Sequence, residues 1–403
     1  MENKAVRKDS YMVVAPPVPT QETGISGLYF DFYDGFRVLS PQDKNYTIKL
    51  IDRDTYVKIV DTIAPAGNSS NTRRYFVNYR LEVWETNQLV YAHDYDAKGK
   101  KVLLQFAGDA LDKLVAWIPY AEEFRKKHGC ELYVTVDKKY AAIFKAGYPE
   151  IHFVSARTRL PADFYATYCV GLLASQDNKQ QQPADWRIVG LQKYCAYLLG
   201  LPPVEVRPRL LPSKKASSLC PKEPYVCIGT QATAQAKYWN NAIGWMETVA
   251  YLKELGYRVL CVDRERVSVN GIRGNVIPYG AEDFTGDRPL QELVDIISGA
   301  AFFIGVSDGL VWLAWGLGIP VILISGCTFP GTEFFTPYRV QQFHICHSCF
   351  NDQRNEQKLG DFASCPHHRG TDREFECSRH ITVGFMKDTI DRLIRDNKKP
   401  AVE

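Results

Sequence analysis

The sequence lacks a strong excess of charge of either sign. Its 403 residues include 49 Lys and Arg against 46 Asp and Glu, which leaves a formal net charge of +3. Because so small an excess gives no general attraction to nucleic acid or to an anionic membrane, neither is expected as a partner. The sequence also lacks the compositional bias of a disordered or collagen-like chain, since 45% of its residues are hydrophobic and 24% are charged. A folded protein of two or three domains is therefore expected.

No segment has the pattern of a secretory leader or a membrane anchor. The first apolar stretch, 11–17, is short and rich in proline. The uncharged run 309–332 is long enough to cross a bilayer. However, Gly318 and Pro320 predict a helix end, a turn and a buried strand at 321–325 instead. We therefore expect a soluble, cytoplasmic protein without a transmembrane segment, and its odd number of cysteines argues against a disulfide framework.

Two blocks of alternating strands and helices follow one another along the chain. In the first block an apolar run at 101–106 precedes a helical stretch at 110–128, and a second strand pattern begins at 131. In the second block, strand patterns at 225–228 and 257–262 enclose a helical stretch at 243–255. Alternation at this spacing predicts βαβ units and parallel sheets. The expected fold is α/β with two Rossmann-like lobes, whose cleft lies at the carboxyl ends of the two sheets.

The segments around these blocks differ in composition. Residues 27–98 alternate apolar and polar side chains and predict a small antiparallel β domain, either a sandwich or a barrel. Six prolines at 202–224 indicate a linker. The expected parts are a flexible arm, a β-barrel-like N-terminal domain, a first lobe, a second lobe, a cysteine-rich insertion and a C-terminal helix, at residues 1–24, 25–98, 99–215, 216–342, 343–380 and 381–403.

Four of the eleven cysteines lie close together near the C-terminus: Cys346, Cys349, Cys365 and Cys377. A Cys-x-x-Cys pair and two further thiolates can form a closed tetrahedral shell of four sulfurs. The polar stretch 351–359 would hardly fold by apolar burial alone, so a metal would replace the missing core. Because a filled shell leaves no position for substrate or water, we favour a structural metal over a catalytic one and over four unrelated thiols. The spacing fits zinc and iron equally.

Asp109 stands just after the first strand of the first block, in the run Phe106-Ala-Gly-Asp. A carboxylate at this place would face the expected cleft and could act as a general base toward a hydroxyl group. Aspartate is also a good helix N-cap, and the position alone fits both interpretations.

The loop 229–239 opens the second block. Its small and hydroxylic residues, beginning with Thr230, would let backbone N–H groups approach an anion, and Lys237 would add a positive charge. The loop lacks the glycine pattern of a P-loop, which excludes an ordinary ATPase. The alternative interpretation is a solvated Lys237 beside a Trp239 that only packs.

A second possible phosphate site lies where a strand gives way to a helix, at Ser307, Asp308 and Gly309. The free N–H groups of the first helical turn could hold a phosphate, or Ser307 or Asp308 could simply cap the helix. Asp263 and Glu265 end another strand of the same block, where acidic residues of related nucleotide-binding folds bind ribose hydroxyls.

Taken in order, these motifs resemble those of the bacterial heptosyltransferases, which are two-lobed GT-B enzymes that use ADP-heptose. The matching features are Gly-Asp109 after the first strand, Lys237-Tyr-Trp239, and Asp308-Gly-x-x-x-Leu-Ala followed by Gly-Ile-Pro320. The four-cysteine insertion and the N-terminal β domain narrow the resemblance to the autotransporter heptosyltransferases, the TibC-like group. The resemblance covers about residues 25–398.

The resemblance implies a role for each candidate residue. Asp109 would be the general base, and Lys237 would contact the phosphates of the nucleotide sugar with Trp239 beside it. The diphosphate loop would be Ser307, Asp308 and Gly309, and the ribose-binding acid would be Asp263 or Glu265. The insertion would hold one structural ferric ion (Fe3+) per chain, with zinc as the alternative, on Cys346, Cys349, Cys365 and Cys377.

One departure from the family pattern bears on the acceptor. Many lipopolysaccharide heptosyltransferases have Asp-Ser/Thr-Gly followed by His-Leu-Ala, whereas this chain has Ser-Asp308-Gly followed by Trp312-Leu-Ala. The difference argues for an acceptor other than lipopolysaccharide.

The activity implied by the resemblance is an inverting transfer of heptose from ADP-heptose to serine hydroxyls in the passenger domain of an autotransporter adhesin. The lobe at 99–215 would face the acceptor, and the lobe at 216–342 would bind the nucleotide sugar. The family also implies a large homo-oligomer, such as a dodecamer. Two alternatives stay open: a GT-B enzyme that uses another nucleotide sugar, and a non-catalytic metal-finger protein that binds a partner.

Overall fold

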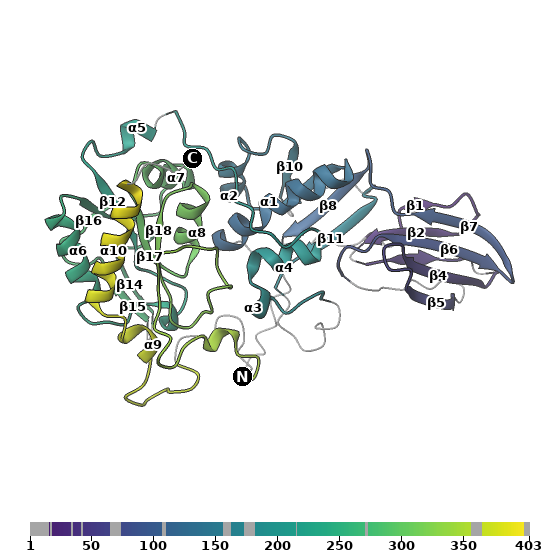
Figure 1. Ribbon diagram of the computed structural model, residues 1–403. Helices are drawn as coiled ribbons and strands as arrows, with labels where there is room; N and C mark the ends of the chain where they lie inside the picture. The colour runs from purple at the N-terminus through teal and green to yellow at the C-terminus, as the bar shows by residue number, and fades with distance from the viewer. Residues whose placement is uncertain are drawn as a thin grey trace, which may run out of the picture.

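The computed structural model describes most of the chain and places two α/β lobes side by side, with a separate β sheet beyond the first lobe (Figure 1). In the described part of the chain, none of the helices combines the length and apolar character that crossing a bilayer requires. The described residues are 16, 18–33, 35–41, 43–64, 74–106, 110–155, 163–172, 182–214, 216–270, 273–355 and 365–398.

The first lobe is built on a mixed sheet with the strand order β1-β2-β11-β8-β9-β10, in which β3 also pairs with β2. From β2 to β10 neighbouring strands run parallel, whereas β1 and β3 pair antiparallel with β2. The strands are β1 (Gln21–Glu22), β2 (Tyr29–Tyr33), β3 (Arg37–Leu39), β8 (Lys101–Phe106), β9 (Glu131–Thr135), β10 (Ile151–Val154) and β11 (Ala166–Val170). Its helices are α1 (Leu111–His128), α2 (Lys138–Phe144), α3 (Trp186–Val189) and α4 (Leu191–Leu198).

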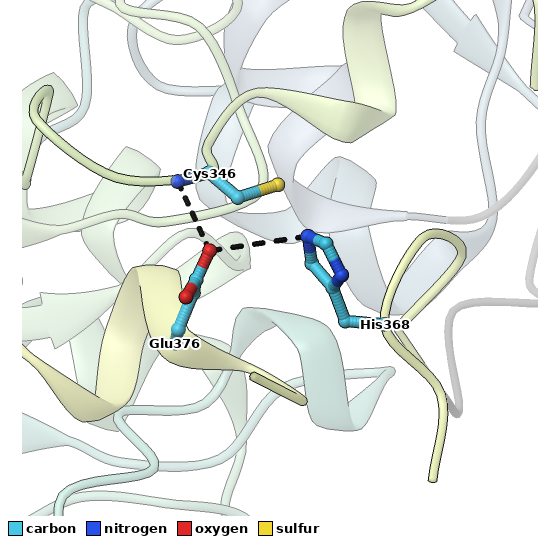
Figure 2. Close-up of side chains that lie close together, drawn as sticks. All are labelled: Cys346, His368 and Glu376. Carbon is cyan, nitrogen blue, oxygen red and sulfur yellow. Dashed lines mark hydrogen bonds and ion pairs between the residues drawn. The ribbon is translucent and has the colours of Figure 1, made fainter. Parts of the chain in front are cut away.

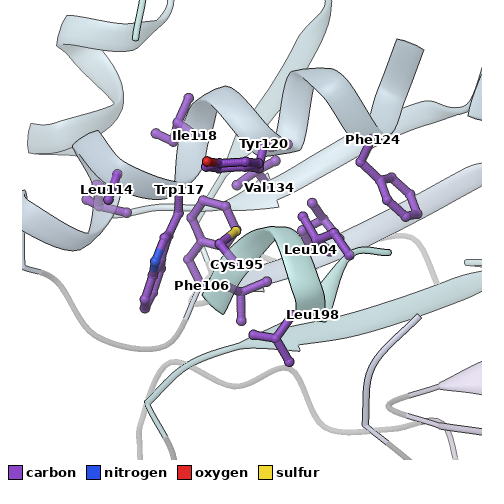
Figure 3. Close-up of a cluster of buried hydrophobic side chains, with 14 of the residues drawn as sticks. Leu104, Phe106, Leu114, Trp117, Ile118, Tyr120, Phe124, Val134, Cys195 and Leu198 are labelled. Carbon is purple, nitrogen blue, oxygen red and sulfur yellow. The ribbon is translucent and has the colours of Figure 1, made fainter. Parts of the chain in front are cut away.

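Helix α1 carries the core of the first lobe (Figure 3). Trp117 and Tyr120 are at most 1% exposed, and they pack with Phe106 and Leu104 of β8 beneath the helix. Their polar atoms are satisfied, because Trp117 Nε1 donates to the Leu191 carbonyl at 3.0 Å and the Tyr120 hydroxyl donates to a nearby main-chain carbonyl. Each such buried aromatic side chain stabilises the fold by about 1.5–3 kcal/mol. The packing fixes the start of α1, where the site lies.

The second lobe has a parallel sheet with the order β16-β13-β12-β17-β18-β19. Its strands are β12 (Tyr225–Gly229), β13 (Arg258–Cys261), β16 (Glu282–Asp283), β17 (Phe303–Val306), β18 (Val321–Ile324) and β19 (Arg339–Val340). Its helices are α5 (Ala216–Leu219), α6 (Gly244–Glu254), α7 (Leu290–Ser298), α8 (Gly309–Gly316), α9 (Glu376–Arg379) and α10 (Val383–Lys398), with short 3-10 turns at η2 (Gln235–Lys237) and η3 (Cys349–Asn351). A hairpin, β14 (Val267–Asn270) and β15 (Arg273–Val276), leaves this lobe after β13.

The two lobes meet through α1 and α8, which pack against each other. A Cβ atom added to Gly309 would lie 3.0 Å from Leu111 Cβ, and one added to Gly316 would lie 3.3 Å from Val115 Cγ1. The two glycines are seven residues apart and therefore share one face of α8. The helices thus approach closely, and the starts of both helices lie near each other.

The N-terminal β region differs from the expected self-contained sandwich or barrel. Strands β4 (Tyr46–Asp52), β5 (Lys58–Ala64), β6 (Tyr79–Glu85) and β7 (Gln88–Asp94) form an antiparallel sheet in the order β5-β4-β6-β7. Strands β1–β3 instead join the sheet of the first lobe, because β2 pairs with β11 at Phe32 and Ala166. Part of the expected flexible arm is also ordered, since Gln21 and Glu22 form β1. The domain boundaries themselves stay a prediction.

The proline-rich connection between the lobes is packed against both of them. The Gln192 side chain hydrogen-bonds both main-chain groups of Val206 at 2.8 and 3.2 Å. At the far end, Asp295 of α7 accepts hydrogen bonds from the Ser213 N–H at 2.7 Å and from its hydroxyl at 2.5 Å. The predicted linker therefore acts as a fixed strap, because these hydrogen bonds tie its main chain to α4 at one end and to α7 at the other.

Candidate functional site

The loop after β12 brings Lys237 to the junction of the two lobes. Burial by itself would lower the pKa of Lys237, but the carboxylates of Asp308 and then Asp112 outweigh burial, and the pKa stays above its ordinary value. Asp112 lies in the first turn of α1, in the first lobe, and Asp308 precedes α8 in the second. A half-buried cation is thus held between acidic groups of both lobes, at the place where the expected cleft would lie.

Asp308 caps α8 and ties it to the Lys237 loop. Its carboxylate accepts from the Gly309 N–H at 2.6 Å and from the Thr233 N–H at 3.0 Å. Burial raises the pKa of Asp308, and Lys237 opposes that shift. The N-cap interpretation of Asp308 is therefore confirmed, and it is compatible with an anion at this helix start, since other first-turn N–H groups remain.

Ser307 belongs to a buried polar chain behind the α8 start. Its hydroxyl donates to Glu333 at 2.5 Å, and Glu333 pairs with Arg339 at 2.9 Å. The two charged side chains are only 2% and 10% exposed. The hydroxyl of Ser307 is thus engaged by Glu333, so it stabilises the conformation of the loop before α8.

Asp263 is occupied inside the second lobe. Its two carboxylate oxygens accept from the Thr230 N–H and hydroxyl and from the Gln231 N–H, at 2.6–3.1 Å. Asp263 and Thr230 are each 1% exposed, and burial raises the pKa of Asp263. These two residues therefore tie the β12 loop to β13, and Glu265 is the more exposed of the two candidate acids.

Trp239 points into the protein core. It is 4% exposed, its Nε1 donates to the Ile381 carbonyl at 3.0 Å, and its ring packs on Trp245. This geometry favours the packing interpretation that the sequence left open for Trp239. Asp109 lies outside the described residues, and the nearest described residue is Ala110, which directly precedes α1.

The four predicted metal ligands lie near one another. Burial, followed by repulsion from the thiolate of Cys327 and then from those of Cys377, Cys365 and Cys346, raises the pKa of Cys349. Cys349, Cys365 and Cys377 are 7–8% exposed, and none of the four is in a disulfide. Buried thiols that disfavour one another's ionisation fit a cation in their midst, because a bound metal stabilises the thiolate form.

A histidine and a carboxylate flank the cysteine group (Figure 2). Ligand atoms of Cys346, His368 and Glu376 lie within 4.8 Å of one another. Glu376 is already engaged, because it accepts from the Cys346 N–H at 3.2 Å and from Arg373 at 2.6 Å. Sulfur remains the predicted donor set, and Glu376 orients the segment around it.

Two family models match this chain. Residues 24–87 match the model described as "Glycosyltransferase TibC, N-terminal domain", and residues 176–362 match "Glycosyltransferase family 9 (heptosyltransferase)". The autotransporter heptosyltransferase Aah of Escherichia coli is 43% identical over 369 residues, which is 91% of this chain and 93% of Aah. The autotransporter heptosyltransferase TibC of E. coli O78:H11 (strain H10407) is 40% identical over 398 residues, 98% of this chain and 97% of TibC. This chain belongs to the autotransporter heptosyltransferases.

The fold of this heptosyltransferase agrees with that assignment. A crystal structure described as the iron-containing dodecameric glycosyltransferase TibC superposes with a TM-score of 0.89 and covers 96% of this chain and 100% of TibC. The predicted GT-B fold and the family resemblance are both confirmed. A further relative, BimC of Burkholderia thailandensis, is 38% identical over 378 residues (93% of this chain and 88% of BimC) and is named an inactive autotransporter heptosyltransferase.

Several residues of this heptosyltransferase site were not foreseen. Asp112, Glu333 and Arg339 surround Lys237 or the loop beside it, but acidic and basic residues at such positions usually indicate solvated surface. Cys327, which is not among the four predicted ligands, also lies beside Cys349 and Cys377. Its distance from them in the sequence gave no signal, because the contact depends on how the insertion folds back onto the end of β18.

Proposed function

We propose that this heptosyltransferase moves heptose from ADP-heptose to a serine hydroxyl of an autotransporter adhesin, in the cytoplasm and with inversion. The observation that carries the proposal is the likeness to TibC over nearly the whole chain, at 40% identity. A second TibC structure is described as a complex with ADP-D-beta-D-heptose, and it superposes on this chain with a TM-score of 0.88.

In the proposed site for ADP-heptose, the positive groups are already in position before the reaction. The diphosphate would lie against Lys237 and the first turn of α8. There the N–H groups and the ammonium group would stabilise the negative charge that develops on ADP as it leaves. Glu265 would bind the ribose, since the carboxylate of Asp263 is already occupied by Thr230 and Gln231. Fixed positive groups at this place remove the need for a divalent ion.

Asp109 would remove the proton of the acceptor hydroxyl as that oxygen attacks the anomeric carbon and the bond to ADP breaks. Support comes from its place in the sequence, three residues before Asp112, whose charge acts on Lys237. One displacement from the face opposite the leaving group inverts the anomeric centre. Such a base typically contributes 10²–10⁴-fold to the rate.

The first prediction is that Asp109→Asn binds ADP-heptose normally but transfers heptose about 100-fold more slowly or worse, because only the proton acceptor is lost. Isothermal titration with ADP and mass analysis of the adhesin passenger give the two quantities. Asp137→Asn, which alters a helix cap in the same lobe, is the control and should keep the parent rate. A parent rate in Asp109→Asn would remove this residue from the mechanism.

The assay also separates the alternatives. A nucleotide sugar other than ADP-heptose as donor would add a different mass, and a non-catalytic metal-finger protein would add none. Because the relative BimC is named inactive, activity must be measured with this protein itself, from the mass of its product.

For the cysteine group we propose one ferric ion on Cys346, Cys349, Cys365 and Cys377. The support is the gathering of the four thiols and the description of TibC as iron-containing. The ion would stabilise the thiolates and brace the insertion. Elemental analysis of the purified protein distinguishes about one iron per chain from zinc or no metal.

We further propose a large homo-oligomer, because the TibC crystal structure is described as dodecameric. The mass of the particles in solution, measured by light scattering, decides this point. A monomer at micromolar concentration would overturn it.

A further inference from the structure

The loop that carries Lys237 rests on the four-cysteine segment. Ala234, which precedes the η2 turn, and Ala236, which lies inside it, share a small apolar cluster with Cys327 and Cys349. The methyl groups just before Lys237 are therefore packed against one predicted metal ligand, Cys349, and against the thiol of Cys327.

Asn240 holds the turn around Lys237 in shape. Its Oδ1 accepts from Gln235 Nε2 at 2.6 Å, and its Nδ2 lies 3.1 Å from the carbonyl oxygens of Gln235 and Tyr238. Since these bonds join the residues before and after Lys237, whatever orients the Asn240 amide also orients the lysine.

Ser378 orients that amide from the cysteine segment. Asn240 Nδ2 donates to Ser378 Oγ at 2.9 Å. Ser378 directly follows Cys377, lies in α9 and is 1% exposed. This hydrogen bond therefore connects the residue next to a predicted metal ligand, Cys377, directly to the loop that carries Lys237.

Further bonds anchor the same loop just beyond α9. Trp239 Nε1 donates to the Ile381 carbonyl, and Asn241 Nδ2 lies 3.2 and 3.1 Å from the carbonyl oxygens of Arg379 and Ile381. Three consecutive residues after Tyr238 thus bond to the stretch 378–381. The conformation of the Lys237 loop is therefore tied to that of α9 and the residues after it.

We infer that the four-cysteine segment positions Lys237 for the diphosphate of the donor, with Ser378 as the positioning residue. The inference rests on the proposed function, because it takes a nucleoside diphosphate as the ligand of Lys237. A loop that leaves its binding conformation part of the time binds its ligand more weakly by the fraction of time lost. A neutral hydrogen bond contributes about 0.5–1.5 kcal/mol, which corresponds to an affinity change of about 2- to 10-fold.

The test compares two serine variants in the same segment. Ser378→Ala removes the bond to Asn240, whereas Ser348→Ala removes a hydroxyl that is also buried and next to a metal ligand, Cys349. Within the described residues, the Ser348 hydroxyl makes no hydrogen bond, so this variant is the matched control. We expect Ser378→Ala to raise the Kd for ADP about 2- to 10-fold, and to raise KM for ADP-heptose likewise. KM for the acceptor and the metal content should stay at parent values in both variants.

Each outcome decides the matter. Parent-like ADP affinity in Ser378→Ala would overturn the inference and leave the proposed function standing, whereas no ADP binding by the unsubstituted protein would end both. Weakened binding together with loss of metal, or equal weakening in Ser348→Ala, would also overturn the role of this hydrogen bond. If Ser378→Ala does not fold, Asn241→Ser tests the same loop from its other anchor, because a serine hydroxyl can still accept from the Ile243 N–H, as Asn241 Oδ1 does, but cannot reach the two carbonyls. An unchanged Kd for ADP in that variant would equally contradict the inference.

Discussion

At the scale of single residues, His128 makes the protein sensitive to acid. It ends α1 among aromatic rings, with ring centroids 4.4 Å from Phe124 and 4.8 Å from Phe76, and its Nε2 is buried without a partner in the described part of the chain. Burial, with a smaller contribution from Lys127, lowers the pKa of His128 to about 4. The folded state therefore holds the neutral imidazole at pH values where the unfolded chain is already protonated.

The sign of the pH dependence follows from that difference. Above about pH 6.5, the ordinary pKa of histidine, both states are neutral and His128 has no effect. Between about 6.5 and 4 the unfolded state gains a proton first, so the free energy of unfolding falls by up to about 3 kcal/mol. We predict that His128→Phe removes this loss, as shown by urea unfolding at pH 7 and pH 4.5. His152→Phe, whose parent side chain is 52% exposed, should keep the parent profile, and an unchanged slope in His128→Phe would contradict the prediction.

Residue identity alone could locate the site but could not assign every role in it. Asp308 and Lys237 lie close in space, as their place after β17 and β12 predicted, because parallel strands end at one edge of a sheet. Asp263 satisfies the same rule and yet turns inward to Thr230. Whether a carboxylate faces a ligand or a neighbouring loop depends on side-chain geometry, about which sequence spacing says nothing.

At the scale of elements, the strap between the lobes depends on a glycine. A Cβ atom at Gly147 would lie 2.0 Å from the Arg209 carbonyl oxygen, a main-chain atom that cannot rotate away. We predict that Gly147→Ala destabilises the protein by about 1–3 kcal/mol, the usual cost of overpacking. It should also expose the stretch 202–214 to limited proteolysis. Gly384→Ala in α10 is the control, because its nearest neighbour, Thr382 Oγ1, is 3.8 Å away. Equal resistance of the strap in parent and Gly147→Ala would refute this account.

Elements with a strong pattern were predicted well, and elements that depend on distant partners were not. The helix expected at 110–128 and the strand expected at 101–106 are α1 and β8. The uncharged run at 309–332 also begins as helix, turn and strand. By contrast, the pairing of β2 with β11 and the hairpin β14–β15 were missed. Strand pairing across more than 130 residues leaves no local periodicity, and the apolar–polar alternation of β14, Val-Ser-Val-Asn, spans only four residues.

At the scale of the whole molecule, the transfer reaction requires both lobes in one arrangement. Lys237 and Asp308, which are proposed to bind the nucleotide sugar, belong to the second lobe, whereas the proposed base Asp109 belongs to the first. The contact between α1 and α8 sets the distance between them, and it is close because α8 presents Gly309 and Gly316 to the first lobe. A larger side chain on that face would separate the lobes while leaving each sheet intact.

Substitution at Gly316 therefore tests how the two lobes are arranged, because it leaves the proposed reacting groups themselves unchanged. A Cβ atom there would already lie 2.8 Å from Pro208 Cγ and 3.0 Å from Leu210 Cδ1, so the branched side chain of Gly316→Val must push the strap and α1 away from α8. ADP should still bind within about twofold of the parent affinity, because the groups proposed to hold it lie in the second lobe. The transfer rate should fall about 10-fold or more, since misplacing reacting groups by about 1 Å can cost up to 100-fold. Titration with ADP and single-turnover transfer measure the two effects. A parallel loss of both would mean that Gly316 supports the second lobe itself, and no loss of rate would mean that the α1–α8 contact does not set the reacting distance.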